Sequence, residues 1–517
     1  MTILVLGAGI MQIPALETAR RNGWRLIVAD GNPDAPGRHL ADAFHAVDLS
    51  DEEGLLELAR DYRNHGQLDG VFTAGTDFST SVAYVAESLG LPGLDYESAR
   101  NARDKFRMRR VLREAGVPAP AFVEVQGVVD LRADSLPTFP LVVKPVDNMG
   151  ARGVRRVDTP AELEEAVPEA LRFSRSGRVV VEEFISGPEF SIDALVVDGT
   201  LHLCGIADRH IRFPPYFIEV GHTMPTERSE ADQQRIAGVL EAAAQALGIR
   251  NGAAKGDIFL TDNGPMVGEV AARLSGGYMS GWTYPYSSGV EPTEGAMRIA
   301  LGLDPGDLTP RRRWTAAERA SVSIPGVVAE VRGIDSVQKM GAIRDLFERV
   351  GPGDEVVFPR NNTEKAANVI AAAPEREEAV RAAEGGIARI IVRLEPNRDE
   401  TAAFLDEPTG PQALKLHDER NRRALSVMPE DIANAGVRAY HPLPAPEAET
   451  SPDWNYRTLS DTLSILSSLT GLRPARRGEA GYGRRFWRRL LKGGLQGALF
   501  HLDTLNEDRR DRRDGTE

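Results

Sequence analysis

The stretch that decides the fold is FPLVVKPVDNMGARGVRRV (residues 139–157), followed after an expected helix by RVVVEEFISGPEFSID (residues 178–193). In the first part, a short apolar strand leads to Lys144 and then to a loop with Gly150 and Gly153. Glycines let a backbone approach a phosphate closely, the free N–H groups point at the anion, and a lysine adds a point charge. In a P-loop the lysine follows the glycines and opens a helix, so this would be a different kind of phosphate site. The two parts together indicate such a site more specifically than either part alone.

These strings resemble the nucleotide site of the ATP-grasp ligases, the superfamily of D-alanine–D-alanine ligase and the bacterial L-amino-acid ligases. The resemblance implies that an antiparallel sheet and a glycine-loop subdomain hold ATP between them. It implies that Lys144 orients the γ-phosphate, that residues 182–185 line the adenine pocket, and that Glu189 binds the ribose. The residues expected to bind the nucleotide are Lys105, Lys144, Gly150, Ala151, Gly153, Glu182, Glu183, Phe184, Ile185 and Glu189.

Only one of the two adjacent glutamates, Glu182 and Glu183, can face such a pocket, because side chains alternate along a strand. The alternative is that both are charges on an edge strand. Between the glycine loop and this strand, Thr159-Pro160-Ala161-Glu162 has the pattern of a capping box and predicts the start of a helix.

Composition and charge set the class of protein. The 517 residues allow roughly three domains, and 42% hydrophobic with 27% charged residues is ordinary for a soluble globular protein. The net charge of −14 argues against general nucleic-acid binding, which depends on clustered lysine and arginine. The single cysteine, Cys204, excludes an internal disulfide and favours a reducing compartment. Its neighbours Leu201 and Leu203 favour a small buried residue over a catalytic thiol.

No targeting or membrane segment is evident in the sequence. No basic residue precedes the apolar N-terminal run, as it would in a signal peptide. No stretch approaches ~18 uninterrupted apolar residues, the length that a membrane-spanning helix needs. We therefore expect no transmembrane helix and a cytoplasmic location.

The N-terminus has the pattern of a doubly wound βαβ domain. An apolar strand at residues 3–6 leads to GAG (residues 7–9), and a second strand at residues 25–29 ends at Asp30. NAD binding would need a third glycine where the chain has Gln12, so a degenerate βαβ domain is favoured. The ATP-grasp resemblance agrees, because those ligases commonly begin with such a domain. Asp77 follows a further strand, where it is expected to cap a helix rather than bind a ligand.

Residues 98–116 are predicted to form one helix, which ends at Gly116-Val117-Pro118. Lysines in such helices are usually solvated. Here the string SARNARDKFRMRRVLREAGVPAP (residues 98–120) resembles the family's helix that enters the ATP domain. The resemblance implies that Lys105 reaches the nucleotide phosphates.

GDIFLTDNGPMVGEVAAR (residues 256–273) predicts a metal site. Asp262-Asn263-Gly264 is a hairpin signal between two apolar strands. If the turn is centred on Asn263, Asp257 and Glu269 lie directly opposite each other. Opposed like charges are destabilising, and a divalent cation removes the conflict; oxygen ligands suit Mg²⁺ or Mn²⁺. A register slip of one residue would break this argument.

The family resemblance extends over the same hairpin and the preceding loop. EVAARLSGGY (residues 269–278) resembles the amino-acid-ligase form, in which Glu269 binds metal and Arg273 holds the transferred phosphoryl group and the substrate carboxylate. The usual Asn or Pro between them is replaced by alanine, and Asp257 stands where many relatives have Glu. PPYFIEVGHTMP (residues 214–225) resembles the substrate loop of the L-amino-acid ligases. It implies that Glu219 and His222 face the acyl acceptor, with His222 as a general base or a polar contact.

The fold expected from these patterns is α/β, with an α+β ATP-binding part: an ATP-grasp fold with an N-terminal doubly wound domain and a small C-terminal lobe. Residues 303–395 show short strands and a helix, which resemble the lobe that closes the ligase core. Residues 396–450 indicate a loose connector with one helix near residues 414–425. The expected domains are residues 1–97, 98–302, 303–395 and 396–517.

The last segment predicts an amphipathic helix with a basic start, which includes Arg489 and Lys492. We expect it to pack on its own core or on a dimer mate with the basic residues solvated; docking to a membrane surface is the alternative. The apolar residues at helical spacing are Phe486, Trp487, Leu490, Leu491, Leu495, Ala498, Leu499 and Leu502.

The function implied by the resemblance is an ATP-dependent carboxylate–amine ligase that works through an acyl phosphate. The cofactors would be ATP and Mg²⁺ or Mn²⁺, and the substrates small carboxylates and amines such as amino acids. A purine-pathway ligase acting on formate or bicarbonate, a carboxylase using carboxyphosphate, and a non-catalytic nucleotide-binding scaffold remain as alternatives. The expected catalytic residues are Arg273, His222, Glu219 and Lys144, and the expected metal ligands are Asp257 and Glu269.

Overall fold

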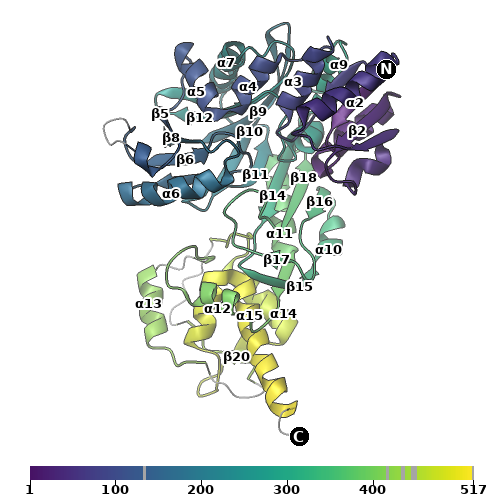
Figure 1. Ribbon diagram of the computed structural model, residues 1–517. Helices are drawn as coiled ribbons and strands as arrows, with labels where there is room; N and C mark the ends of the chain where they lie inside the picture. The colour runs from purple at the N-terminus through teal and green to yellow at the C-terminus, as the bar shows by residue number, and fades with distance from the viewer. Residues whose placement is uncertain (132–135, 415–417, 432–436, 444–450, 515–517) are drawn as a thin grey trace. The chain divides into compact units, whose positions relative to one another are not determined.

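The computed structural model describes residues 1–517 except 132–135, 415–417, 432–436, 444–450 and 515–517. The chain forms two compact units, Met1–Glu318 with Ala372–Ala379, and Arg319–Ala371 with Val380–Glu517. Each unit is described by itself below, with the labels of Figure 1. The four domains expected from the sequence stay our proposed assignment.

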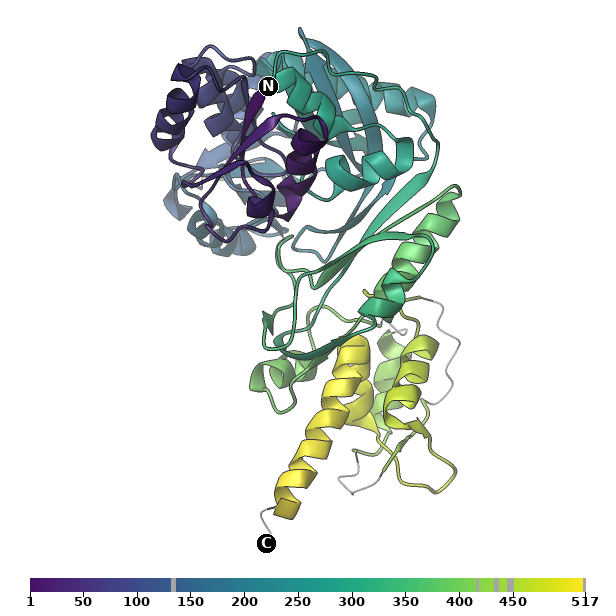
Figure 2. The same ribbon diagram turned by 90° about the vertical axis from the view of Figure 1, so that its right-hand side faces the viewer.

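The N-terminal part is the expected doubly wound domain. Its four parallel strands are ordered β3-β2-β1-β4, and Figure 2 shows the purple strands with helices on both sides. Side chains alternate along β1, so Ile3 and Val5 pack toward α1 and α9 (Pro292–Ala300), whereas Leu4 and Leu6 pack toward α2 and α3. The elements are β1 (Thr2–Leu6), α1 (Ile13–Arg21), β2 (Arg25–Asp30), β3 (Ala43–Ala46), α2 (Glu52–Asn64), β4 (Gly70–Phe72) and α3 (Ser79–Ser88).

The first turn of this domain is filled by the chain's own side chains. The carboxylate of Asp30 accepts the N–H of Ala8 at 2.7 Å. Gln12 is buried; its Oε1 accepts the N–H of Gly9 at 3.0 Å, and its Nε2 donates to the carbonyl of Ala74. Gln12 therefore occupies the space next to the glycines, which fits the degenerate domain expected from the sequence.

The single helix predicted for residues 98–116 is wrong in one respect. The structure has two helices, α4 (Tyr96–Arg103) and α5 (Lys105–Glu114), which are separated at Asp104. Asp104 has extended backbone angles, and its side chain accepts the N–H of Arg107 at 3.0 Å. Asp104 thus begins a new helix as an N-cap, a role that aspartate favours. Asp77 does not cap α3 as expected: the residue at the cap is Phe78, and Asp77 lies 3.7 Å from Arg103.

The glycine-loop subdomain is an antiparallel sheet ordered β5-β8-β6-β7 with α6 packed on its apolar face. Thr159 caps α6 as predicted, because its hydroxyl accepts the N–H of Glu162 at 3.3 Å. The Glu162 carboxylate accepts the N–H of Asp158, one residue earlier than a complete capping box requires. The elements are β5 (Phe122–Val125), β6 (Leu141–Pro145), β7 (Arg155–Val157), α6 (Pro160–Phe173) and β8 (Val179–Glu183).

The largest sheet of the first unit carries the expected metal hairpin and substrate loop. Its antiparallel strands run β13-β12-β9-β10-β11, with β14 (Thr315–Ser321) next to β11. Helix α7 packs on its apolar face, together with Met108 and Leu112 of α5. The elements are β9 (Glu189–Val197), β10 (Thr200–Arg212), β11 (Ile218–Met224), α7 (Glu230–Leu247), β12 (Gly252–Thr261), β13 (Gly264–Ala271), α8 (Tyr284–Ser288) and α9 (Pro292–Ala300).

The second unit begins with the short strands expected for a small lobe. In it β15 pairs with β17 and with β19, and β16 pairs with β18. The described residues contain two helices in this stretch rather than the one expected. The elements are β15 (Gly326–Arg332), α10 (Ile334–Gln338), β16 (Ile343–Glu348), β17 (Glu355–Val356), β18 (Ala367–Ala373), α11 (Arg376–Arg389) and β19 (Ile391–Leu394).

The stretch expected to be a loose connector contains α12 (Asp399–Asp406), which the sequence reading missed, as well as α13 (Asp418–Ser426). The helix predicted near residues 414–425 lies partly outside the described residues. The remaining elements of this unit are β20 (Ala439–Tyr440), α14 (Leu459–Thr470), β21 (Arg473–Pro474) and α15 (Arg484–Asp514).

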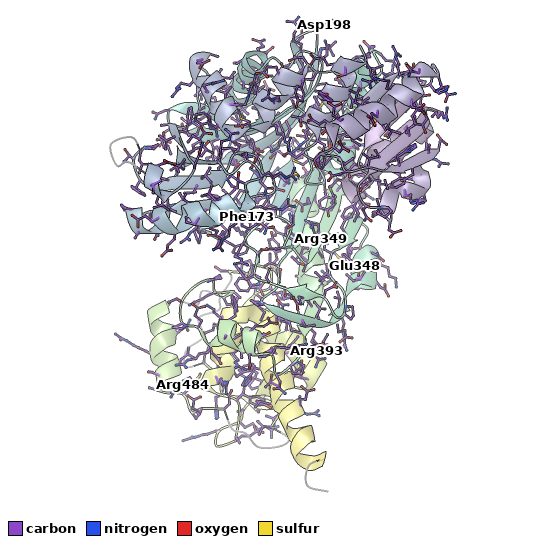
Figure 3. All side chains as sticks on the ribbon, viewed as in Figure 1. Phe173, Asp198, Glu348, Arg349, Arg393 and Arg484 are labelled. Carbon is purple, nitrogen blue, oxygen red and sulfur yellow. The ribbon has the colours of Figure 1, made fainter. Side chains whose placement is uncertain are left out.

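The last helix, α15, packs on the core of its own unit. All eight apolar residues predicted to share one face are at most 8% exposed. The expectation that the basic residues are solvated is wrong for Arg489 and Lys492: Arg489 is 2% exposed and pairs with Asp406 at 2.8 Å, and Lys492 is 4% exposed and lies 5.0 Å from the ring of Phe404. Figure 3 labels Arg484, which donates to the carbonyls of residues 425 and 428. No helix among the described residues is long and apolar enough to cross a membrane.

Candidate active site

In the hairpin of β12 and β13, which is expected to bind the metal, Asp257 and Glu269 pair as predicted, but the turn is centred elsewhere. Thr261 pairs with Gly264, so the turn is centred between Asp262 and Asn263 rather than on Asn263. The register then shifts by one residue next to Gly268, a β-bulge. The two offsets cancel, and Asp257 lies directly opposite Glu269, as predicted.

A second bulge, in β11, brings together Glu219 and His222, the two residues expected to face the acyl acceptor. Glu219 and His222 are three positions apart, which in a regular strand puts them on opposite faces. In β11, however, His222 pairs with Arg209 while Glu219 pairs with Ile211, because the register shifts near Gly221. Both side chains therefore lie on the face that carries Arg209, and His222 Nε2 is 3.5 Å from Glu219 Oε2.

The glycine loop is held by its own side chains and by α6. Gly150, Ala151 and Gly153 all have positive φ, between 59° and 70°. A side chain at Gly153 would also be strongly crowded by Phe173, with a Cβ only 2.9 Å from its ring. Asn148 donates through Nδ2 to the carbonyl of Phe173 at 2.7 Å. The sequence of this loop thus produces the tight turn that a phosphate cradle needs.

An ion pair between the buried Lys105 and the partly exposed Glu269 connects the glycine loop to the hairpin expected to bind the metal. Lys105 Nζ donates to the carbonyl of Asn148 at 2.7 Å and lies 3.1 Å from Glu269 Oε1. Burial favours neutral forms of both groups, but their mutual attraction lowers the pKa of Glu269 and raises the pKa of Lys105, to which Asp77 also contributes. Lys105 therefore lies between the two expected phosphate-site elements as a charged ammonium.

Glu182 is the glutamate that points inward, whereas Glu183 is exposed. Glu182 lies 2.6 Å from Lys144 Nζ and 2.8 Å from Arg109 Nε, and Arg109 also donates to the carbonyl of Gly268 at 2.5 Å. Burial alone would raise the pKa of Glu182, but Arg109 and Lys144 lower it. Arg109 thus ties the strand of the expected adenine pocket to the bulge of the metal hairpin.

The segment expected to line the adenine pocket has part of its backbone already bonded. The N–H of Glu183 donates to the carbonyl of Ala121 at 2.9 Å, and the N–H of Phe184 donates to the carbonyl of Pro140 at 3.1 Å. The ring of Phe184 stacks on Phe217 with centroids 6.2 Å apart. Because these two N–H groups are already bonded, the part of this segment that could contact an adenine ring is the aromatic side chain of Phe184. Ile185 next to it is half-buried.

A partly buried arginine of β10, Arg209, connects carboxylates of three other strands of the large sheet. Arg209 pairs with Glu189, with Glu219 at 3.0 Å and with Asp257 at 3.2 Å. Burial opposes its charge, but these carboxylates raise the pKa of Arg209 well above its usual range. Burial raises the pKa of Glu189 despite Arg209. Glu189, proposed for the ribose, is therefore held by a guanidinium.

Asp257 accepts three donors. Its Oδ1 accepts the hydroxyl of Ser191 at 2.8 Å, and its Oδ2 contacts Arg209 and the ammonium of Lys255. Burial raises the pKa of Asp257, but Arg209 and Lys255 outweigh it and lower the value. Asp257 is thus an ionised carboxylate, the form a hard cation binds.

A Mg²⁺ or Mn²⁺ ion fits two oxygen donors of this chain, Asp257 and Glu269, both of which are opposed and ionised. Among the described residues, no group of three or more His, Cys, Asp or Glu side chains is arranged to hold a metal ion. An ion bound here would therefore take its other ligands from nucleotide oxygens and water, as magnesium commonly does.

His222 is 1% exposed and lies between two carboxylates. Its Nδ1 is 3.4 Å from Glu318 Oε2, and Glu318 is also 1% exposed. A Cβ at Gly277 would lie 2.7 Å from Glu219 Oε1 and 3.3 Å from His222 Cε1, so only glycine lets the loop after β13 approach this pair. The loop that follows Arg273 is thus adjacent to the expected acceptor residues.

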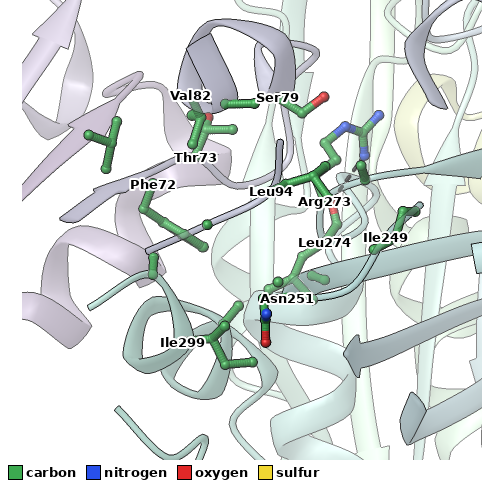
Figure 4. Close-up of a pocket in the computed structure, with 18 residues that line it drawn as sticks. Phe72, Thr73, Ser79, Val82, Leu94, Ile249, Asn251, Arg273, Leu274 and Ile299 are labelled. Atoms are coloured by element: carbon green, nitrogen blue, oxygen red, sulfur yellow. Dashed lines mark hydrogen bonds between the residues drawn. The ribbon is translucent and has the colours of Figure 1, made fainter. Parts of the chain in front are cut away.

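Arg273 itself lines a small apolar cavity of about 60 Å³ between β4, α9 and the end of the hairpin. Figure 4 shows its guanidinium pointing away from the side chains of Phe72 and Ile299. The cavity is far smaller than the hundreds of Å³ that ligand pockets occupy, so it is not the nucleotide site. Arg273 donates to the carbonyl of Leu274 at 3.0 Å.

Asp193 anchors the Arg273 loop. Its carboxylate accepts the N–H of Ser275 at 3.0 Å and the Ser275 hydroxyl at 2.5 Å. It is fully buried, and burial raises the pKa of Asp193 to about 6, against these hydrogen bonds and the nearby Lys255 and Arg273. The folded protein therefore binds this proton more tightly than the unfolded chain does.

The Asp193→Asn variant is expected to gain stability relative to the unsubstituted protein as pH rises. Between pH 3.8 and 6 the unfolded aspartate ionises while the folded one stays protonated, so the unsubstituted protein loses stability until pH 6. From pH 4.5 to 7 the difference in unfolding free energy changes by about 2 kcal/mol in favour of the variant. Urea unfolding at both pH values measures it.

The matched control is Asp198→Asn, at an exposed hairpin turn labelled in Figure 3. It should change the two unfolding midpoints equally. An Asp193→Asn difference that is the same at pH 4.5 and pH 7 would contradict the proposed proton uptake.

Five residues of this site were missed by the sequence reading. Each is a single charged residue on a strand or a helix, and no recognisable motif surrounds it. Its place in the site becomes clear only when the pairing of the strands is known. Period-two spacing was the one usable signal, because it puts Lys255 on the face of Asp257. The missed residues are Arg109, Asp193, Arg209, Lys255 and Glu318.

Comparison with known proteins agrees with this geometry. Residues 137–281 match the family model of the ATP-grasp domain, and residues 16–93 match the ATP-grasp N-terminal domain. The chain therefore belongs to the ATP-grasp superfamily of ATP-dependent ligases. Residues 321–395 match the L-amino acid ligase C-terminal domain 2, which assigns the small lobe to the L-amino acid ligase type.

Individual relatives are distant but extensive. The crystal structure of L-amino acid ligase from Bacillus licheniformis superposes with a TM-score of 0.67 at 26% identity, covering 76% of this chain and 98% of that one. Human carnosine synthase 1 is 25% identical over 73% of this chain, which spans about half (49%) of that protein. The formate-dependent phosphoribosylglycinamide formyltransferase of Rhodococcus jostii is 26% identical over 67% of this chain and 85% of its own length.

Proposed function

We propose that the chain joins a small carboxylate to an amine, with amino acids as substrates, through an acyl phosphate and with release of ADP and phosphate. One observation carries the proposal: Lys105 contacts both the glycine loop and Glu269. Glu269 lies opposite Asp257, and both are on the sheet that also carries Glu219 and His222. The residues that we propose as metal ligands and as acceptor contacts thus share one sheet. The L-amino acid ligase type of the small lobe supports the amide-forming reaction.

In the proposed reaction, Lys144, Lys105 and the loop N–H groups hold the phosphates, and Asp257 and Glu269 hold Mg²⁺, which supplies charge neutralisation when bound. An oxygen of the substrate carboxylate bonds to the γ-phosphorus as the bond to the β-phosphate oxygen breaks. Arg273 stabilises the negative charge that develops.

In the second half, the amine nitrogen attacks the acyl carbon and phosphate leaves. The amine proton passes to His222, whose Nδ1 faces Glu318 at 3.4 Å. Glu219, 3.5 Å from His222 Nε2, holds the ammonium form of the amine, which gives one proton to His222 before its nitrogen attacks; the second proton leaves with the phosphate.

ADP release by the full chain with ATP and Mg²⁺, assayed against pools of amino acids and small acids, tests the proposal. We expect ADP with an amino-acid pool and an amide product by mass spectrometry. ADP with formate or bicarbonate instead would favour a purine-type ligase, as the Rhodococcus relative suggests. No ADP with any pool would favour a nucleotide-binding scaffold.

A further inference from the structure

The chain uses lysine sparingly, and half of its described lysines gather at this site. Of 62 lysine and arginine residues only seven are lysine. Six of the seven lie in the part of the chain that the structure describes. Three of these six, Lys105, Lys144 and Lys255, contact Glu269, Glu182 and Asp257 respectively. Lysine carries a compact point charge with three donors, whereas the guanidinium of arginine is planar and larger. The lysines at this site therefore put compact positive charges next to its carboxylates.

Lys255 has no role yet in the proposed reaction, and its position is tightly specified. It lies on β12 two residues before Asp257, so both side chains share one face. It pairs across the sheet with Asp193 on one side and Ala271 on the other. Its ammonium contacts Asp257 Oδ2. Alanine at position 271 offers no further ligand atom beside it.

The ammonium occupies the part of Asp257 that a second metal ion would need. Oδ1 of Asp257 accepts the Ser191 hydroxyl at 2.8 Å, and Oδ2 already contacts Lys255 and, at 3.2 Å, Arg209. A carboxylate has about four acceptor positions in total. One more cation can share the remaining acceptor position of Asp257 with Glu269, but a second cation would find no acceptor position left on Asp257.

We propose that the ammonium of Lys255 stands in for a second divalent cation, so that the site binds one metal ion per nucleotide, between Asp257 and Glu269. This rests on the proposed function, because it presumes that the hairpin binds a metal–nucleotide complex. Lys255 then supplies a fixed positive charge beside the triphosphate that does not depend on the metal concentration.

The test counts metal ions rather than turnover. Mn²⁺ replaces Mg²⁺, the β,γ-imido analogue of ATP replaces ATP, and the full chain is kept in excess over nucleotide. Free Mn²⁺ is measured by electron paramagnetic resonance. We expect one bound Mn²⁺ per protein-bound nucleotide in the unsubstituted chain and two in Lys255→Ala. Lys255→Arg keeps the positive charge, so it should stay at one.

Lys339→Ala is the matched control, because Lys339 is an exposed lysine at the end of α10, and it should stay at one. Two Mn²⁺ in the unsubstituted chain, or one in a folded Lys255→Ala that still binds the analogue, overturns the proposal. The count in the unsubstituted chain decides even if Lys255→Ala does not fold. Failure of that chain to bind the analogue at all would instead refute the proposed nucleotide site, and the inference with it.

Discussion

The Asp257→Asn, Glu269→Gln double variant is expected to lose ADP formation by at least about 10³-fold, because loss of a single positioned electrostatic group commonly costs 10²–10³. Both substitutions keep the size of the side chain but remove the charge that a hard cation binds. Asp257 and Glu269 are opposed across β12 and β13, and because both are changed at once, neither can compensate for the lost charge of the other. Steady-state ADP release and Mg²⁺-dependent ATP affinity measure the effect.

Asp262→Asn is the matched control for this experiment. Asp262 is an exposed acid at the tip of the same hairpin, and asparagine suits a turn equally well. The control should keep the activity of the unsubstituted protein, and thermal unfolding should show that the double variant is folded. Unchanged ATP affinity and turnover in a folded double variant would refute the metal site.

The Arg109→Met variant is expected to lower the unfolding free energy of its unit by about 3–5 kcal/mol, the typical cost of removing one partner of a buried ion pair. Arg109 is 1% exposed, and without it Glu182 keeps only Lys144 as a partner. The carbonyl of Gly268 loses its donor as well. Urea unfolding followed by circular dichroism measures the loss.

The loss should shrink in acid. Burial opposes ionisation of Glu182, but Arg109 and Lys144 lower its pKa below the ordinary 4.5, so their stabilisation is present above pH 4.5 and disappears as pH falls through the lowered value. Arg110→Met is the matched control: Arg110 is half-exposed and 3.9 Å from Glu114, and such surface pairs contribute about 0–1 kcal/mol. Equal losses in the two variants would contradict the role given to Arg109.

The fold was largely predictable because it depends on local patterns that survive in one sequence. The uninterrupted apolar run from Ile3 to Leu6 is typical of a strand buried on both faces, as β1 is, and Asp198-Gly199 has the pattern of the tight turn across which Val197 pairs with Thr200. The break at Asp104 was missed because the apolar spacing continues through it, and only the hydrogen bond to Arg107 shows that a new helix begins.

Site residues that lie in a recognisable sequence motif were predictable. Residues that reach the site only through the pairing of distant strands were not. Asp257 and Glu269 were paired correctly from a turn centre that was off by half a residue, since the bulge at Gly268 compensates. Arg209 has no motif, and its three carboxylate partners lie on β9, β11 and β12. Contacts of this kind depend on the order of the strands in the sheet, so they can be recognised only when the whole sheet is known.

The position of α15 affects how the protein is made. Asp503 in this helix pairs with Arg393 of β19 at 2.5 Å, and Gln496 donates to the carbonyl of Val392 and accepts the N–H of Ile324. These partners leave the ribosome more than a hundred residues earlier than the helix that completes their packing. The second unit therefore completes its packing only once α15 has been synthesised, whereas Met1–Glu318 can begin to fold while the rest of the chain is still being made.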